Sequence, residues 1–209
     1  MDDDGEYRKT ETMASSLSLT EIKQLLSENP DYSRIDTFVE TGTNQGRTIF
    51  LMQEHFRELH TVELSKRYYL KVMCRRFVRT FKKLFWKTPG AISPQKTRFY
   101  LGDSAVVIKQ LAASINKPAV FFLDSHCCGT RTARGQKDVP LLEELGAISQ
   151  RKFPDLIIID DARLFGTSHA QDWLDITKEN MLKCFPKDQV KKHYVSNDRF
   201  ILLTSPTQG

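Results

Sequence analysis

Short apolar segments alternate with longer helical patterns along most of the chain. The apolar segments are IDTFVE (35–40), LHTVEL (59–64), TRFYL (97–101), AVFFLD (119–124) and LIIIDD (156–161). Between them, apolar residues recur at helical spacing over residues 46–57, 104–115 and 140–151. This alternation of strand and helix predicts an α/β fold.

The central apolar segments lack the polar alternation of half-exposed strands. Runs such as VFFL and LIII are typical of strands that helices cover on both faces, as in a parallel sheet. The last segment, HYVSNDRFILLTS, predicts two strands joined by a turn at Ser196, Asn197 and Asp198. We therefore expect a Rossmann-like open sheet, mostly parallel, with helices on both faces and a C-terminal antiparallel hairpin.

The chain begins with a polar segment that precedes an amphipathic helix. Residues 1–16 carry early acids and no apolar stretch, so we expect a mobile tail rather than a secretory signal. Ser18 and Glu21 have the spacing of a capping box and predict a helix over residues 19–28. Residues 17–209 suit one domain, and no apolar run is long enough for a bilayer span, so a cytoplasmic protein is expected.

The net charge of +5 is concentrated in one segment. Residues 64–88 carry no acid and nine cations: Lys66, Arg67, Lys71, Arg75, Arg76, Arg79, Lys82, Lys83 and Lys87. Apolar residues of the same segment form one helical stripe: Leu70, Met73, Phe77, Phe81 and Leu84. We expect a basic helical insertion over about 64–88 that packs its apolar stripe on the sheet, with contact to a polyanion or a membrane surface as the alternative.

The residues that follow the first apolar segment suit a small-ligand loop. Ligands of parallel α/β sheets bind beyond the carboxyl ends of the strands, so these positions are the ones expected to carry chemistry. In VETGTNQGRT, Gly42 and Gly46 allow a tight turn with open backbone amides at the start of a helix. Glu40 favours a cationic or amine-bearing ligand over a pyrophosphate.

Acidic residues also follow the second and third apolar segments. Glu63 ends the second, where a carboxylate can accept both hydroxyls of a ribose. After the third, Asp103 is placed to meet an adenine amine and Ser104 to cap the next helix. Together with the glycine loop, these acids predict a nucleoside ligand.

Three carboxylates follow the fourth and fifth apolar segments: Asp124, and the adjacent pair Asp160 and Asp161. Neighbouring central strands would bring them together, and two charges about 4 Å apart repel by roughly 4 kcal/mol at an effective dielectric near 20. A shared proton, a cation such as Arg163, or a divalent metal could compensate this repulsion.

These segments resemble the class I S-adenosylmethionine-dependent methyltransferases over about residues 35–204. ETGTNQG is similar to their acid-x-Gly-x-x-x-Gly loop, Glu63 to their ribose-binding acid and LGDS to their adenine-side motif. Asn44 stands where many members have a middle glycine, but asparagine tolerates left-handed backbone. The resemblance implies that S-adenosylmethionine is bound by Glu40, Gly42, Thr43, Asn44, Gly46, Glu63, Asp103 and Ser104.

The three aspartates resemble the ligands of metal-dependent O-methyltransferases in that superfamily. In these enzymes an Asp after the fourth strand and an Asp-Asp or Asp-Asn pair after the fifth hold the metal. The resemblance implies a divalent metal, Mg²⁺ or Mn²⁺, bound by Asp124, Asp160 and Asp161. It also implies as acceptor a hydroxyl of a sugar, a glycan or another small polar molecule, with Asp124 or His126 as the catalytic group that takes its proton. FLDSHCCGTRTARGQKDVPLLEEL and IIIDDARLF further resemble a group of uncharacterised methyltransferases, which supplies no substrate.

Two other functions stay open from the sequence. The basic segment 64–88 could bind RNA, in an RNA methyltransferase or in a catalytically silent RNA-binding module. A nucleotide-binding oxidoreductase fits less well, because the glycine loop lacks G-x-G-x-x-G and carries Glu40.

Overall fold

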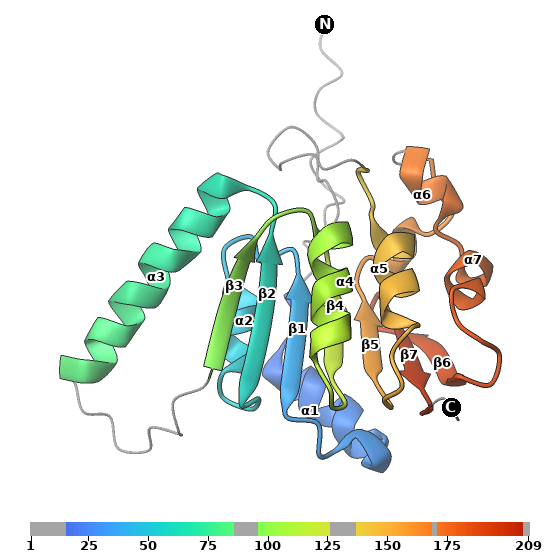
Figure 1. Ribbon diagram of the computed structural model, residues 1–209, viewed down its shortest axis with the longest axis horizontal. Helices are drawn as coiled ribbons and strands as arrows, with labels where there is room; N and C mark the ends of the chain where they lie inside the picture. The colour runs from blue at the N-terminus through green and yellow to red at the C-terminus, as the bar shows by residue number, and fades with distance from the viewer. Residues whose placement is uncertain (1–15, 86–95, 126–136, 169–170, 207–209) are drawn as a thin grey trace, which may run out of the picture.

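Seven strands form one sheet in the computed structural model, which describes residues 16–85, 96–125, 137–168 and 171–206 (Figure 1). In chain order they are β1 (Thr37–Thr41), β2 (Glu58–Glu63), β3 (Lys96–Leu101), β4 (Val120–Leu123), β5 (Leu156–Ile159), β6 (Val190–Ser196) and β7 (Arg199–Thr204). Their order across the sheet is β3-β2-β1-β4-β5-β7-β6. Strands β1 to β5 are parallel, and β7 is antiparallel to both β5 and β6. The expected Rossmann-like sheet with a C-terminal antiparallel hairpin is confirmed.

Helices cover both faces of the sheet (Figure 1). One face carries α1 (Leu19–Glu28) and α2 (Arg47–Met52), and the other carries α4 (Ser104–Ser114) and α5 (Leu141–Ile148). The long α3 (Lys66–Phe85) lies beside the β3 edge, and α6 (Gln171–Asp175) and α7 (Lys178–Lys183) follow β5. Short 3-10 helices span Pro30–Tyr32 and Ala162–Leu164.

The central strands separate two apolar clusters. In β4 and β5, Phe122 and Ile158 pack toward α1 and α2, whereas Phe121 and Ile157 pack toward α4 and α5. All four side chains are buried. The uniform apolar sequence of these strands thus follows from cover on both faces.

Two helices are shorter than their sequence patterns indicate, and two short helices were not expected. The pattern over 46–57 gives α2 only as far as Met52, because the chain then turns so that Phe56 enters the core. The pattern over 140–151 gives α5 only as far as Ile148, because Arg151 turns inward. Helices α6 and α7 span too few turns to show a clear period. The part of the chain that the structure describes contains no helix that is both long and apolar enough to cross a bilayer.

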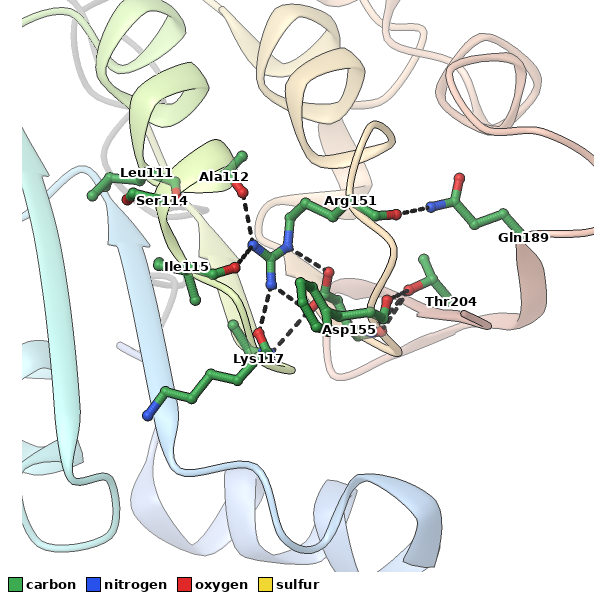
Figure 2. Close-up of polar contacts among 11 residues, drawn as sticks. Leu111, Ala112, Ser114, Ile115, Lys117, Arg151, Asp155, Gln189 and Thr204 are labelled. Atoms are coloured by element: carbon green, nitrogen blue, oxygen red, sulfur yellow. Dashed lines mark hydrogen bonds and ion pairs between the residues drawn. The ribbon is translucent and has the colours of Figure 1, made fainter. Parts of the chain in front are cut away.

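A buried ion pair joins several elements at the amino ends of β4 and β5 (Figure 2). Arg151 Nε lies 2.7 Å from Asp155 Oδ2, and its guanidinium also donates to the carbonyl oxygens of three residues: Ala112, Ile115 and Lys117. The Asp155 carboxylate accepts from the Ala119 amide, and the Asp155 amide donates to Thr204 Oγ1. This cluster links α4, β7 and the segments that precede β4 and β5, at the end of the sheet opposite to the predicted ligand site.

Candidate functional site

The loop between β1 and α2 runs directly against the carboxyl end of β4. Gly42 has a φ of +82°, and a Cβ at this position would lie 2.1 Å from the carbonyl oxygen of Asp124. Gly46, the residue before α2, has a φ of +74° in the left-handed region. Asn44 also has a positive φ of 46°, as its side chain allows. Because the loop lies so close to the end of β4, only glycine fits at position 42.

Glu63, at the end of β2, holds this loop in place. Its Oε2 accepts from the Asn44 amide and its Oε1 from the Ser65 amide, both at 2.7 Å. Burial raises the pKa of Glu63, and the amide hydrogen bonds oppose that rise. The Leu64 amide also bonds this carboxylate, and since a carboxylate has about four acceptor positions, about one is left for a ligand hydroxyl. The ribose role of Glu63 stays a prediction.

Glu40 lies beneath the glycine loop rather than at its surface. Its side chain is buried and Oε2 accepts from Thr61 Oγ1 at 2.6 Å, while Thr61 Oγ1 lies 2.5 Å from Thr43 Oγ1. Burial, together with the charge of nearby Asp124, raises the pKa of Glu40 to about 8. Glu40 is therefore mostly protonated at neutral pH, and it supports the loop through the two threonines.

Protonated Glu40 predicts that stability falls as the pH rises. Since the folded pKa of about 8 exceeds the ordinary value of 4.5, the stabilisation is complete below pH 4.5 and is lost through pH 8. The free energy of unfolding should fall by up to about 1.4 kcal/mol per pH unit across that window. Urea unfolding of Glu40→Gln should show a flatter pH dependence. An equivalent change at exposed Glu179 should leave the slope as it is in the wild type, and equal slopes in all three proteins would contradict the assignment.

Asp103, not Ser104, caps α4. Asp103 Oδ1 accepts from the Ala105 amide at 3.0 Å, so the expected capping role of Ser104 is wrong. Ser104 Oγ instead donates to Ser125 Oγ at 3.0 Å. Ser104 is the first residue of α4, and the cap is the residue before it. The structure does not test whether Asp103 also meets an adenine amine.

A buried glutamate that the sequence reading missed lies on the α5 side of the site. Glu144 is 1% exposed, and its Oε1 accepts from Ser125 Oγ at 2.5 Å. Burial raises its pKa to about 7, while hydrogen bonds from Ser104, Ser125 and Thr41 oppose the rise. Its position was a usable signal, since Glu144 interrupts the apolar face that Leu141, Leu145 and Ile148 form along the same helix.

A small hollow of about 10 Å³, about the room of one water molecule, lies between α5 and the carboxyl ends of β4 and β5. Its polar lining comes from Ser125, Glu144 and Asp160, and its apolar lining includes Leu141 and Trp173. The hollow adjoins the predicted nucleoside site, because Ser125 follows Asp124 beside the glycine loop.

Each of the adjacent aspartates, Asp160 and Asp161, is paired with an arginine. Arg199 Nε lies 3.2 Å from Asp160 Oδ1, and Arg163 Nη1 lies 2.5 Å from Asp161 Oδ1. Arg163 also pairs with Asp198. Asp161 has a φ of +58°, so the backbone turns between the two carboxylates. Of the compensations expected from sequence, a cation is the one seen.

The predicted metal site is not formed by Asp124, Asp160 and Asp161. Within residues 16–85, 96–125, 137–168 and 171–206, no group of three or more His, Cys, Asp or Glu side chains is arranged to hold a metal ion. The physical reason is the pairing of Asp160 and Asp161 with separate arginines. Asp124 lies instead against the glycine loop and close enough to Glu40 to raise its pKa. His126, the other predicted catalytic residue, lies outside the described residues.

Solved structures share this fold, although no family model and no curated protein matches the chain. A proposed O-methyltransferase from Klebsiella pneumoniae aligns with a TM-score of 0.56 and 14% identity, over 93% of this chain and 83% of that one. A proposed caffeoyl-CoA O-methyltransferase from Staphylococcus aureus aligns with a TM-score of 0.54 and 12% identity, over 88% and 80%. The chain has the fold of a class I methyltransferase. It also spans 55% of the spermidine synthase from Thermotoga maritima, at a TM-score of 0.49, 11% identity and 84% cover of this chain.

Within this class I methyltransferase fold, the predicted cofactor residues gather at one edge of the sheet. The glycine loop follows β1, Glu63 ends β2 and Asp103 follows β3, and these strands are adjacent and parallel. A hydrogen bond joins Asn44 of the loop to Glu63. The sequence motifs that are far apart in the chain therefore lie side by side.

Proposed function

We propose that this protein is an S-adenosylmethionine-dependent methyltransferase that methylates a hydroxyl of a small polar acceptor. The observation that carries the proposal is the close approach of Gly42 to the Asp124 carbonyl, which brings the glycine loop against the carboxyl ends of the strands, where parallel α/β sheets bind their ligands. Glu63 and Asp103 flank the loop on the next two strands and would bind the ribose and the adenine. Thr43, Asn44, Gly46 and Ser104 would complete the surroundings of the cofactor.

The acceptor would bind beside the carboxyl ends of β4 and β5, next to the residues that line the small hollow. Its hydroxyl oxygen would attack the methyl carbon of the sulfonium, the carbon–sulfur bond would break, and S-adenosylhomocysteine would leave. Asp124 is the described carboxylate best placed to accept the hydroxyl proton, because its backbone adjoins Gly42 and its neighbour Ser125 lines the hollow. The Klebsiella pneumoniae and Staphylococcus aureus structures are named as O-methyltransferases, which favours a hydroxyl as the acceptor group.

Metal-independent cofactor binding is the expected result of a calorimetric titration with S-adenosylmethionine. The described aspartates do not fit a metal, so the dissociation constants with and without Mg²⁺ or Mn²⁺ should agree within about twofold. Binding that required either metal would contradict the pairing of Asp160 with Arg199 and of Asp161 with Arg163. Failure to bind in every condition would end the proposal.

Replacing Glu63 with glutamine should weaken S-adenosylmethionine binding by about tenfold to a hundredfold, the range for a lost hydrogen bond to a charged group. Glutamine offers one acceptor oxygen, and its amide group would face the N–H of Asn44 or Ser65. Glu58→Gln, at the opposite end of β2, is the matched control and should bind as the wild type does. Equal affinity of the two variants would place the ribose elsewhere.

A further inference from the structure

Helix α3 turns its arginines toward the body of the protein. Arg75 Nη1 donates to the Gln45 carbonyl oxygen at 2.6 Å, the Arg76 guanidinium lies 5.2 Å from the Phe99 ring centre, and Arg79 lies 4.9 Å from that of Phe50. Together with Val72, which is fully buried, these residues form one face of the helix. The expectation that the apolar stripe packs on the sheet is therefore wrong. The arginines take that place because their planar cations stack on two aromatic rings.

The opposite face of α3 is apolar and exposed. Phe77 is 69%, Leu70 53% and Phe81 52% exposed, and Val78 lies beside them. The rings of Phe77 and Phe81 stack with centres 6.2 Å apart. Figure 1 shows the helix extending away from the β3 edge. Because Val72, Arg76 and Arg79 contact the body of the protein, the opposite, apolar face points away from it. A contiguous apolar face of this kind usually marks a binding surface.

Three kinds of partner could cover this apolar face: a second copy of the chain, RNA or an anionic bilayer. The positive charge of α3 helps to decide among them. The helix carries eight cationic residues and no acidic one, so two copies packed along this face would repel each other. RNA bases could stack on Phe77 and Phe81, but three of the arginines that would contact phosphates are already engaged with the protein. Leu70 and Val78 add aliphatic surface that offers a base no ring. An anionic bilayer accepts both properties, because apolar side chains enter between the lipids while flanking cations meet the headgroup phosphates.

We propose that α3 is a docking surface for anionic membranes. Leu70, Phe77 and Phe81 insert into the headgroup region, and the exposed cations Arg67 and Lys71 on the same side contact lipid phosphates. A helix of 20 residues is about 30 Å long and lies in the plane of the bilayer. The proposal stands on α3 alone and does not require methyl transfer.

Vesicle flotation of the full chain tests the proposal. The wild type should float with phosphatidylcholine vesicles that contain phosphatidylserine and not with phosphatidylcholine alone. The double substitution Phe77→Gln and Phe81→Gln should weaken binding by about tenfold or more, since both rings lose their burial among the lipids. Arg67→Gln with Lys71→Gln should weaken binding and reduce its dependence on salt.

The matched control is the double substitution Leu174→Gln and Val195→Gln, which removes two exposed apolar side chains outside α3. It should float as the wild type does. The proposal is overturned if anionic vesicles do not float the wild type, or if the phenylalanine and control variants bind equally. Two further results would overturn it if neither the wild type nor the phenylalanine variant binds vesicles. One is that the wild type retains single-stranded RNA and the phenylalanine variant does not. The other is that the wild type forms a concentration-dependent dimer and the phenylalanine variant does not.

Discussion

Replacing Gly42 with alanine is expected to reduce S-adenosylmethionine affinity by about a hundredfold or more, because the loop would be displaced by an ångström or more from the reacting geometry. The new Cβ would lie 2.1 Å from the Asp124 carbonyl oxygen, and the φ of +82° disfavours any side chain. The loop and the end of β4 must then separate. Strain and overpacking together should also lower the free energy of unfolding by about 2–5 kcal/mol.

Gly146→Ala is the control for this substitution. Gly146 lies within α5, and a Cβ there meets no atom within 4 Å. Alanine should leave cofactor affinity unchanged and raise stability by about 0.5–1 kcal/mol, the usual gain for glycine to alanine within a helix. Calorimetric titration and urea unfolding of both variants give the comparison. Wild-type affinity in folded Gly42→Ala would show that the cofactor does not approach this loop.

Replacing Arg151 with methionine should lower the free energy of unfolding by about 3–5 kcal/mol, the cost of leaving a buried charge without its partner. Asp155 would stay buried among β4, β5 and β7, and three carbonyl oxygens would lose their donor (Figure 2). This loss is a large part of the stability of an ordinary domain. Urea unfolding monitored by circular dichroism measures it directly.

Arg98→Met provides the exposed counterpart. Arg98 pairs with Glu58 at 2.7 Å, but its side chain is 39% exposed, and such pairs contribute about 0–1 kcal/mol. Similar losses in Arg98→Met and Arg151→Met would mean that burial does not set the strength of the Arg151 cluster. Double substitution of Arg151 and Asp155 by apolar residues should cost less than the sum of the single changes.

The strands and the glycine loop could be predicted because their causes are local. Runs such as LIII encode cover on both faces, and Ser18 caps α1 as its spacing indicates, with Ser18 Oγ accepting from the Glu21 amide. The hairpin turn follows from Asn197 and Asp198, which both adopt positive φ. The parallel arrangement then brings the ends of β1, β2 and β3 together without further information.

The partners of the aspartates could not be predicted, because they depend on contacts between distant segments. Arg199 reaches Asp160 from the start of β7, and nothing in LIIIDD indicates that it will do so. The orientation of α3 had a similar cause. Its amphipathic period was clear, but which face meets the body depends on Phe50 and Phe99, which lie on other elements.

A crystal structure with S-adenosylhomocysteine bound would test the central claim most directly. We predict that the ribose hydroxyls lie within hydrogen-bonding distance of Glu63 and that the adenine lies beside Asp103, with the glycine loop against the amino-acid portion. A complex in which the nucleoside lies away from the ends of β1, β2 and β3 would contradict the proposed function, even though the fold would stand.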